Sequence, residues 1–266
     1  MKKIFIYSLF FLVIKTWGQH NKLVVKYDIL YQTTKTLQRT GSLWADNEKA
    51  IFEVDILSAL AKEEKDNKPE QKNTTLHVTK ANITRNYYYL TFLKDNDFLF
   101  LDYLQKGKLI LISDKVGQNW KLTKETKQIN NITCQKAVCS FRGVEWEAWF
   151  APSIPYPYGP WKLRGLPGLI IEAYDVNKKY NYNARSIEYT KALGLLDKDL
   201  EDLANEKKFD KMTMKEFITQ KEEALEAMLV DMKRGGEVKV RNASQNGGKV
   251  RYGRELIYEW EEEPKK

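Results

Sequence analysis

The sequence predicts an α+β fold with a mainly antiparallel, curved β-sheet, arranged as a meander, and a helix near the C-terminus. Apolar, β-branched and aromatic residues alternate with polar ones through the first two thirds of the chain. Turn-forming residues recur about every ten positions. The clearest helical spacing begins at residue 213. Strands followed by a helix, without strand–helix alternation, are typical of an α+β domain.

Neighbouring strands along the chain are expected to pair through short turns. The second and third form a hairpin through Asp46-Asn47, two residues that tolerate the backbone of a tight turn. The clearest hairpin turns at Arg142-Gly143, and Trp146 and Phe150 on its second strand share one face, which we assign to the core. The predicted strands are 23–31, 42–44, 50–54, 76–78, 87–93, 98–104, 109–112, 120–122, 134–141, 144–150, 169–176 and 182–189.

Two other segments depart from the strand pattern. Residues 61–74 are almost wholly polar and predict a mobile loop, because they cannot bury enough surface to offset the entropy of ordering. Thr213 and Glu216 form a capping box that opens a helix over 213–234, and glycines 235 and 236 end it. A shorter helix is expected at 197–206. The apolar stripe of the long helix comprises Phe217, Ala224, Leu225, Met228 and Met232.

Residues 1–18 predict a signal peptide. Basic Lys2 and Lys3 precede an uncharged apolar run over 4–14, which Lys15 ends well short of the roughly 20 residues of a membrane span. Cleavage would leave one β-rich domain over 19–266, with no membrane-spanning segment. Loss of three lysines and no acid lowers the net charge from +8 to +5. We expect an exported protein, in the periplasm or outside a Gram-negative cell, that binds no nucleic acid.

The two cysteines, Cys134 and Cys139, fall on one predicted strand. Extended chain would place their Cα atoms about 17 Å apart, whereas a disulfide allows about 7 Å at most. A bond between them would therefore need a bulge or a turn. The favoured interpretation is two buried small apolar side chains.

A proline–aromatic loop over residues 151–168 separates two strands. It holds five of the seven prolines of the chain, together with Tyr156, Tyr158 and Trp161. Proline fixes φ and glycine opens positive φ. The segment is therefore expected to be an ordered loop rather than regular structure.

The end of this loop carries the hexapeptide Gly165, Leu166, Pro167, Gly168, Leu169 and Ile170. With it, the chain resembles the GLPGLI family of exported proteins, known mainly from Bacteroidota. The resemblance spans about residues 130–176 and implies export and a common fold, but no activity, cofactor or site residue. Cys139 departs from the family pattern. The matching positions also include Cys134, Lys136-Ala137, Phe141-Arg142-Gly143, Trp146, Ala148-Trp149-Phe150, Ile154-Pro155, Gly159-Pro160 and Glu172.

The hexapeptide and its loop have two interpretations. In the favoured one the glycines turn the chain and the apolar side chains cover the sheet edge. In the functional one Tyr156, Tyr158 and Trp161 border a groove, because flat amphipathic rings suit an apolar or sugar-like ligand.

Catalytic and metal chemistry have little support. His20 and His77 are the only histidines, so a nucleophile–histidine pair would depend on one of them. Glu145 and Glu147 alternate on one strand face, as solvated glutamates commonly do. Gly165 to Gly168 match a nucleic-acid-binding GxxG loop, but that loop joins two helices and this one leads into a strand. We expect no enzyme, no cofactor and no metal.

Three functions remain open. The first is a non-enzymatic envelope protein that binds a hydrophobic ligand or lipid on a curved sheet backed by the helix, as lipoprotein-carrier half-barrels do; this is analogy at the level of fold. The second is a scaffold or partner subunit of an outer-membrane or secretion complex. The third, a hydrolase, is disfavoured by the scarcity of histidine. The second would use the acidic tail, Glu259, Glu261, Glu262 and Glu263.

Overall fold

The computed structural model describes residues 22–33, 36–66, 86–94, 97–104, 108–115, 117–191, 209–234, 244–246, 249–251 and 253–261. The expected signal peptide, the strand 76–78 and the helix 197–206 lie outside the described residues. In the described part, no helix is both long and apolar enough to cross a bilayer.

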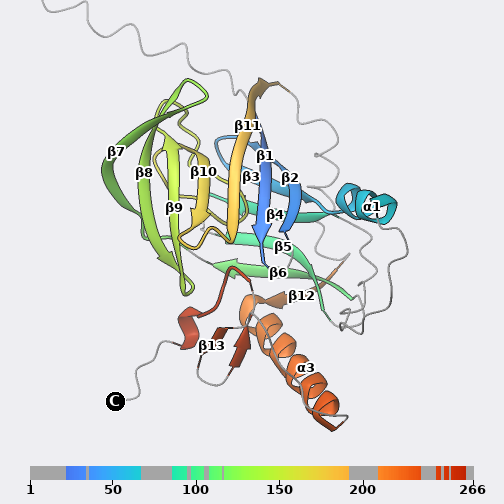
Figure 1. Cartoon of the computed structure of the whole chain (residues 1–266). Helices are drawn as coiled ribbons and strands as arrows, with labels where there is room; N and C mark the ends of the chain where they lie inside the picture. Colours follow the sequence, from blue (N-terminus) through green and yellow to red (C-terminus); the bar gives the residue numbers. More distant parts are fainter. Residues whose placement is uncertain are drawn as a thin grey trace, which may run out of the picture.

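The fold is an open, curved sheet of 12 strands, which confirms the expected antiparallel architecture (Figure 1). Among the strands that the structure describes, only β12 and β6 pair in parallel. The strand order is β12-β6-β5-β4-β3-β2-β1-β11-β10-β9-β8-β7. The bounds are β1 Lys22–Gln32, β2 Thr36–Ala45, β3 Lys49–Asp55, β4 Tyr87–Phe92, β5 Asp97–Tyr103, β6 Leu109–Lys115, β7 Lys121–Ile129, β8 Ile132–Phe141, β9 Val144–Ala151, β10 Leu169–Asp175, β11 Tyr180–Thr190 and β12 Asp210–Thr213.

This order resolves into two meanders, β1–β6 and β7–β11, which meet where β11 pairs with β1. Strand direction turns along the sheet, so that β8–β11 run up and down Figure 1 while β5 and β6 lie across it. Because β6 and β7 lie near opposite edges, the chain between them has to cross the molecule. That connection, residues 117–120, contacts the proline–aromatic loop: Gln118 Nε2 donates to Lys162 O at 3.1 Å, and Trp120 Nε1 to Arg164 O at 2.7 Å.

Two-residue turns set the register of the second meander. Asn130 and Asn131 have φ of 50° and 63° between β7 and β8, and Arg142 and Gly143 have φ of 48° and 75° between β8 and β9. Such positive φ pairs match the right-handed twist of the flanking strands. The second turn lies where the sequence predicts it.

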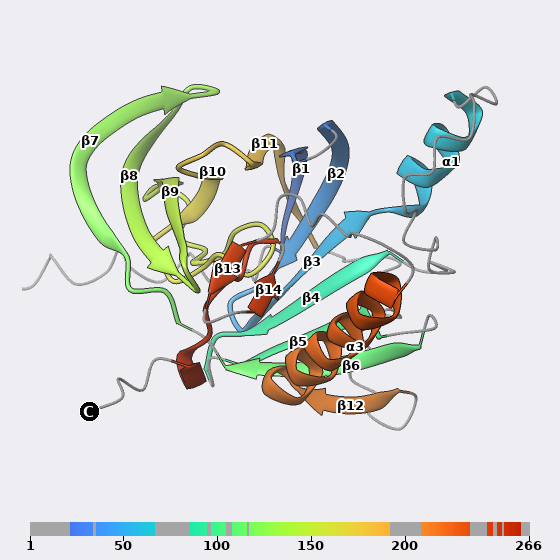
Figure 2. The same cartoon turned by 60° about the horizontal axis from the view of Figure 1, so that its bottom comes forward.

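The inner side of the curved sheet is filled by the chain's own proline–aromatic loop. Tyr27 of β1 donates a hydrogen bond from its hydroxyl to Ile170 O at 2.6 Å, and the rings of Trp146 and Trp161 lie 5.6 Å apart. Figure 2 shows the loop between β9 and β10 inside the curve. The loop is ordered, as expected: Leu169 N donates to Ile154 O, and Ile170 N to Tyr158 O.

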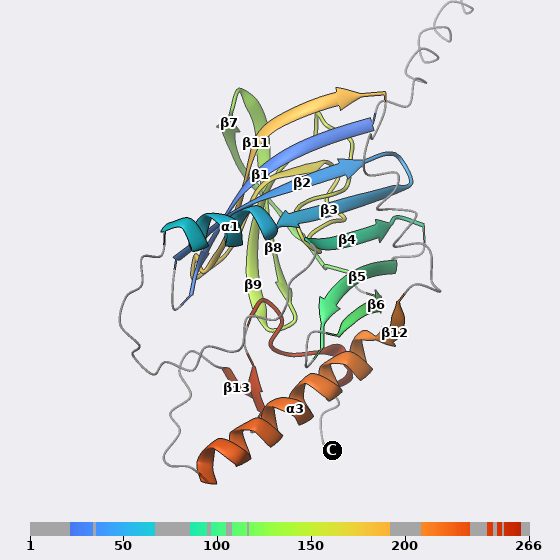
Figure 3. The ribbon, with the colours of Figure 1, turned by 90° about the vertical axis from the view of Figure 1, so that its right-hand side faces the viewer.

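The helices correct two expectations. Residues 61–66, expected in a mobile loop, belong to α1 (Leu57–Asp66), and the rest of that segment lies outside the described residues. The helix expected at 213–234 is confirmed as α3 (Met214–Arg234), but it does not back the sheet. Met214 and Phe217 are buried, whereas Val230 is 52% exposed. Figure 3 shows α3 extending away from the β6–β12 end of the sheet.

Both cysteines are buried in β8 and unbonded, as the favoured interpretation expects. Burial raises the pKa of Cys134 to about 11 and that of Cys139 to about 12. The thiols are therefore protonated at neutral pH and behave as small apolar side chains.

Candidate functional site

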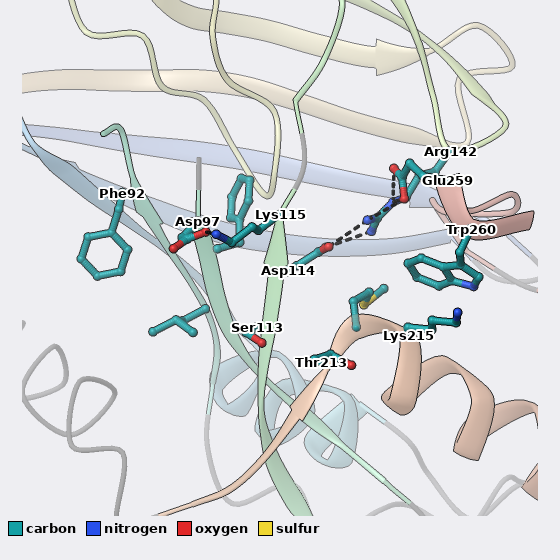
Figure 4. A pocket seen from close by; sticks show the side chains of 13 residues that line it. Phe92, Asp97, Ser113, Asp114, Lys115, Arg142, Thr213, Lys215, Glu259 and Trp260 are labelled. Carbon is teal, nitrogen blue, oxygen red and sulfur yellow. Dashed lines mark hydrogen bonds and ion pairs between the residues drawn. The ribbon is translucent and has the colours of Figure 1, made fainter. Parts of the chain in front are cut away.

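A pocket of about 900 Å³ opens where β5, β6, the start of α3 and the C-terminal segment, residues 253–261, come together (Figure 4). Apolar and charged side chains both line it, so its lining suits an amphipathic molecule. The lining residues are Phe92, Asp97, Phe98, Leu99, Ser113, Asp114, Lys115, Arg142, Thr213, Met214, Lys215, Glu259 and Trp260.

Local sequence explains how these residues come to face the pocket. Strands β5 and β6 pair with Phe98 opposite Asp114 and Leu99 opposite Ser113. The capping box fixes the start of α3: Thr213 N donates to Glu216 Oε2 at 2.8 Å, and Glu216 N donates to Thr213 Oγ1 at 3.3 Å. These hydrogen bonds fix the backbone at Thr213, which lines the pocket.

Three of the lining residues, Asp114, Arg142 and Glu259, belong to an ion cluster that also includes Lys162 and Glu255. Arg142 donates to both carboxylate oxygens of Asp114, at 2.9 and 2.8 Å. Its remaining donors reach Glu255 at 2.5 Å and Glu259 at 2.9 Å. The side chains of Arg142 and Asp114 are 1% and 2% exposed, so this pairing is withdrawn from solvent.

Lys162 is the second buried cation of the cluster. It comes from the proline–aromatic loop, and its ammonium donates to Asp114 Oδ2 at 2.8 Å and to Glu255 Oε1 at 2.9 Å. The same ammonium lies 4.4 Å from the centroid of the Phe100 ring. The charge cluster thus joins Asp114 of β6, Arg142 of the β8–β9 turn, the proline–aromatic loop and the C-terminal segment.

The cluster sets the protonation of Asp114. Burial alone would raise the pKa of this carboxyl, but the charges and hydrogen bonds of Lys162 and Arg142 outweigh burial and hold the pKa below its ordinary value. For Arg142, burial opposes the charge, but hydrogen bonding to Asp114 and the charge of Glu255 raise the pKa above its ordinary value. Asp114 and Arg142 are therefore both ionised at neutral pH.

The acidic tail expected to contact a partner instead folds back on the chain. Glu259 accepts from Arg142, and Glu261 accepts from Arg251 Nη1 and Nη2, each at 2.5 Å. Arg251, in β14 (Lys249–Arg251), also donates to Glu222 of α3 at 2.6 Å. Glu262 and Glu263 lie outside the described residues.

The three aromatic residues predicted to border a groove are in the core. Tyr156, Tyr158 and Trp161 are 8%, 1% and 3% exposed, and none of them lines the pocket. This corrects the expectation of an exposed rim. The loop closes on itself through the Tyr158–Arg164 bridge, and the adjacent Trp161 adopts φ of 56°.

The residues of the hexapeptide contact the protein core and turn the chain. Leu166, Leu169 and Ile170 are buried, while Gly165 and Gly168 take φ of 85° and 156°. A Cβ on Gly168 would lie 2.2 Å from Ala151 O. The glycine is needed there because the start of β10 passes against the end of β9.

Metal-binding clusters are not found in the described part of the chain. No group of three or more His, Cys, Asp or Glu among these residues could hold a metal ion. Glu147 is ion-paired with Lys136 at 3.1 Å and accepts from the Tyr174 hydroxyl, which gives this strand face an ion-pair role.

Sequence reasoning missed the ion cluster. Its members come from β6, a turn, a loop and the C-terminal segment, so no spacing along the chain brings them together. One local signal was available: Lys162 lies between Trp161 and Leu163 in a segment otherwise rich in apolar residues. A lysine in that setting requires a buried partner.

Comparison with known proteins supports the fold. No family model and no curated protein matches the chain. Two structures of PNGF-II match with TM-scores of 0.50 and 0.51, at 19% and 18% identity, over 75% and 76% of this chain. This chain spans about a third of PNGF-II, 32% and 33% in the two structures. At such identities the likeness concerns the fold alone.

A third structure is described as an outer membrane lipoprotein-sorting protein domain from Vibrio parahaemolyticus. It matches with a TM-score of 0.31 and 8% identity, over 69% of this chain and 91% of that one. A score this low carries no argument about fold or function.

Proposed function

We propose that this chain is a non-enzymatic envelope protein that binds an amphipathic, lipid-like molecule in the pocket between β5, β6, α3 and the C-terminal segment. The observation that carries this proposal is the pocket itself. At about 900 Å³ it lies within the range of roughly 300–1,000 Å³ that small-molecule sites occupy.

The apolar lining residues support a lipid-like ligand. Phe98, Leu99, Met214 and Trp260 line the pocket, and Trp260 stacks on Tyr258 with ring centroids 4.6 Å apart and planes 6° apart. Burial of an alkyl chain against such side chains contributes about 0.8 kcal/mol for each CH₂ group.

The charged lining residues support a polar end on the same ligand. Lys115 and Lys215 line the pocket beside Asp97 and Glu259, and the Lys115 ammonium lies 3.2 Å from Asp97. These groups would orient a head group while the alkyl portion lies on Phe98 and Leu99. The inner side of the curved sheet, where the ligand was expected from the sequence, is filled by the proline–aromatic loop, so we place the ligand in this pocket instead.

The lining favours a binder over a hydrolase. Its hydroxyls come from Ser113 and Thr213, and Thr213 is engaged with Glu216 in the capping box. No histidine is among the lining residues, so neither hydroxyl has the customary base.

Binding of a fluorescent fatty acid to the mature protein, with native mass spectrometry of the purified protein, tests this proposal. Leu99→Trp, which fills the pocket, should weaken binding by at least about tenfold, because the displaced alkyl chain loses several buried CH₂ contacts. Leu122→Trp is the matched control, since Leu122 is 51% exposed on β7 and outside the pocket. Equal binding by both variants, or no binding by the wild type, would reject the proposal.

We also propose that the chain is a GLPGLI-family protein exported to the periplasm or cell exterior. The supporting residues are the hexapeptide and the apolar run of residues 4–14. The mass of the protein recovered from the cell envelope tests export. A mature chain beginning at Gln19 is expected, and an intact N-terminus in the cytoplasmic fraction would contradict it.

A further inference from the structure

Arg254, in the C-terminal segment, lies in a cage of aromatic side chains. Its guanidinium carbon is 4.4 Å from the ring centroid of Trp161 and 5.5 Å from that of Tyr31. Its Nη1 donates to the hydroxyl of Tyr31 at 3.3 Å and to the hydroxyl of Tyr182. Aromatic faces and phenolic oxygens together form a site specific for a planar cation.

The next residue, Glu255, binds two cationic side chains. Its carboxylate accepts from Arg142 at 2.5 Å and from Lys162 at 2.9 Å. Without Glu255 and Glu259, the rest of the cluster would hold two buried cations against one buried carboxylate, that of Asp114. The surface under the segment therefore selects an arginine followed directly by an acid.

Backbone contacts complete the recognition of the segment. The N–H groups of Leu256 and Ile257 both donate to Arg142 O, at 2.7 and 3.1 Å. Ile257 packs on Gly143, where any added Cβ would lie 2.8 Å from Ile257 Cγ1. The β8–β9 turn thus holds the main chain of the segment as well as one of its side chains.

The residues that contact the C-terminal segment belong to strands, a turn and a loop whose positions are set by the sheet and not by this segment. Tyr31 is in β1, Tyr182 in β11, Arg142 in the β8–β9 turn, and Trp161 and Lys162 in the proline–aromatic loop. Buried charge pairs often contribute no more to stability than apolar residues of equal volume, but their charges discriminate between partners. Buried charge pairs between the segment and the sheet therefore suit recognition of a specific peptide better than they suit the filling of a hydrophobic core.

We propose that Tyr31, Tyr182, Trp161, Arg142 and Lys162 form a peptide-recognition site that the chain fills with its own residues 254–259. The partner is a protein that presents an arginine followed by a glutamate or aspartate, and it occupies the site by displacing these residues. Glu259 and Trp260 also line the pocket, so displacement removes one of its walls. The peptide site itself does not depend on the proposed ligand.

The test uses the full mature chain with Arg254→Ala and Glu255→Gln, which weakens the internal occupant, and a fluorescent peptide copying residues 253–261. Fluorescence anisotropy should show the peptide binding this variant at least about tenfold more tightly than the wild type, whose site is filled. A peptide carrying the same two substitutions should lose that binding. Equal affinity for variant and wild type, or for the two peptides, would overturn the proposal.

Near-ultraviolet circular dichroism establishes that the double variant is folded. If it is not, Arg254→Ala alone leaves Glu255 on Arg142 and Lys162 and is measured in the same way, with the same expected preference over the wild type. A variant that elutes as a dimer and binds no peptide would identify a second copy of this chain as the occupant. That result would also overturn the proposal of a different partner protein.

Discussion

The guanidinium of Arg142 is paired end-on with the carboxylate of Asp114, through hydrogen bonds of 2.9 and 2.8 Å between buried side chains. The pair joins the two meanders, because Arg142 ends the β8 side of the β8–β9 hairpin and Asp114 lies in β6. Arg142 takes φ of 48° in its turn, a conformation that favours glycine or asparagine. The side chain's role in the cluster accounts for an arginine in that position.

Asp114→Asn should lower the free energy of unfolding by about 3–5 kcal/mol, because it leaves Arg142 and Lys162 buried with one carboxylate fewer. Urea denaturation followed by tryptophan fluorescence measures the change. The matched control is Arg185→Gln, since Arg185 and Asp28 form an ion pair of 58% and 56% exposed side chains. That substitution should change the free energy by less than about 1 kcal/mol. Similar losses in both variants would show that the buried cluster is no more important than a surface pair.

Acid should weaken the same pairing. Since the pKa of Asp114 is lowered in the folded state, its contribution is complete above the unfolded pKa of about 3.9 and is lost as the pH falls through the folded value. The difference in unfolding free energy between the wild type and Asp114→Asn should therefore be constant near neutral pH and shrink below about pH 4. A difference that stayed unchanged into acid would contradict an ionised Asp114.

Some elements were predictable because their signals are local. The Arg142-Gly143 turn and the capping box at Thr213 each depend on residues within four positions of one another, and both are found. Asn130-Asn131 was an equally local turn signal that the strand assignment overlooked. Helix α1 was missed because its lysines and glutamates look like a polar loop, although they are good helix formers. Its start is marked by Asp55, which accepts from Ser58 N at 3.0 Å.

The pocket could not be predicted because its walls depend on pairing between distant strands. The position of Trp161 shows the same limit. Trp161 was placed at a rim from its loop context, but the crossing connection at Gln118 and Trp120 and the C-terminal Arg254 enclose it on the inner side of the sheet. Composition indicated an ordered loop, whereas its direction depended on partners more than 30 residues away.

The cysteines should be unreactive in the folded protein. Burial raises the pKa of Cys134 to about 11 and that of Cys139 to about 12, so neither provides thiolate at neutral pH. A chromogenic disulfide reagent should label both thiols in concentrated guanidinium chloride and label them slowly, at the rate of opening, in buffer. Rapid labelling of the native chain would contradict their burial.

Two buried tyrosines should respond oppositely to loss of the hydroxyl. Tyr27→Phe should cost about 1–3 kcal/mol, because it leaves Ile170 O without its buried donor at 2.6 Å. Tyr158 Oη is also buried but has no hydrogen-bond partner among the described residues. Tyr158→Phe should therefore be neutral or stabilise the protein by up to about 1 kcal/mol. Chemical denaturation measures both, and a large loss in Tyr158→Phe would reveal a partner for that hydroxyl.

The two glycines of the hexapeptide are required for different reasons: Gly168 for lack of space around its Cα, and Gly165 for its positive φ. A Cβ on Gly168 would meet Ala151 O at 2.2 Å, and strand backbone cannot retreat as a side chain can, so Gly168→Ala should cost more than about 3 kcal/mol. Gly165 has φ of 85° with open space around the added carbon, so Gly165→Ala should cost only about 1 kcal/mol, from backbone strain. Thermal and urea unfolding of the two variants give the comparison. Equal losses would mean that close packing of β10 on β9 does not explain the second glycine. A loss of ligand binding in Gly165→Ala without loss of stability would instead give the hexapeptide a direct binding role.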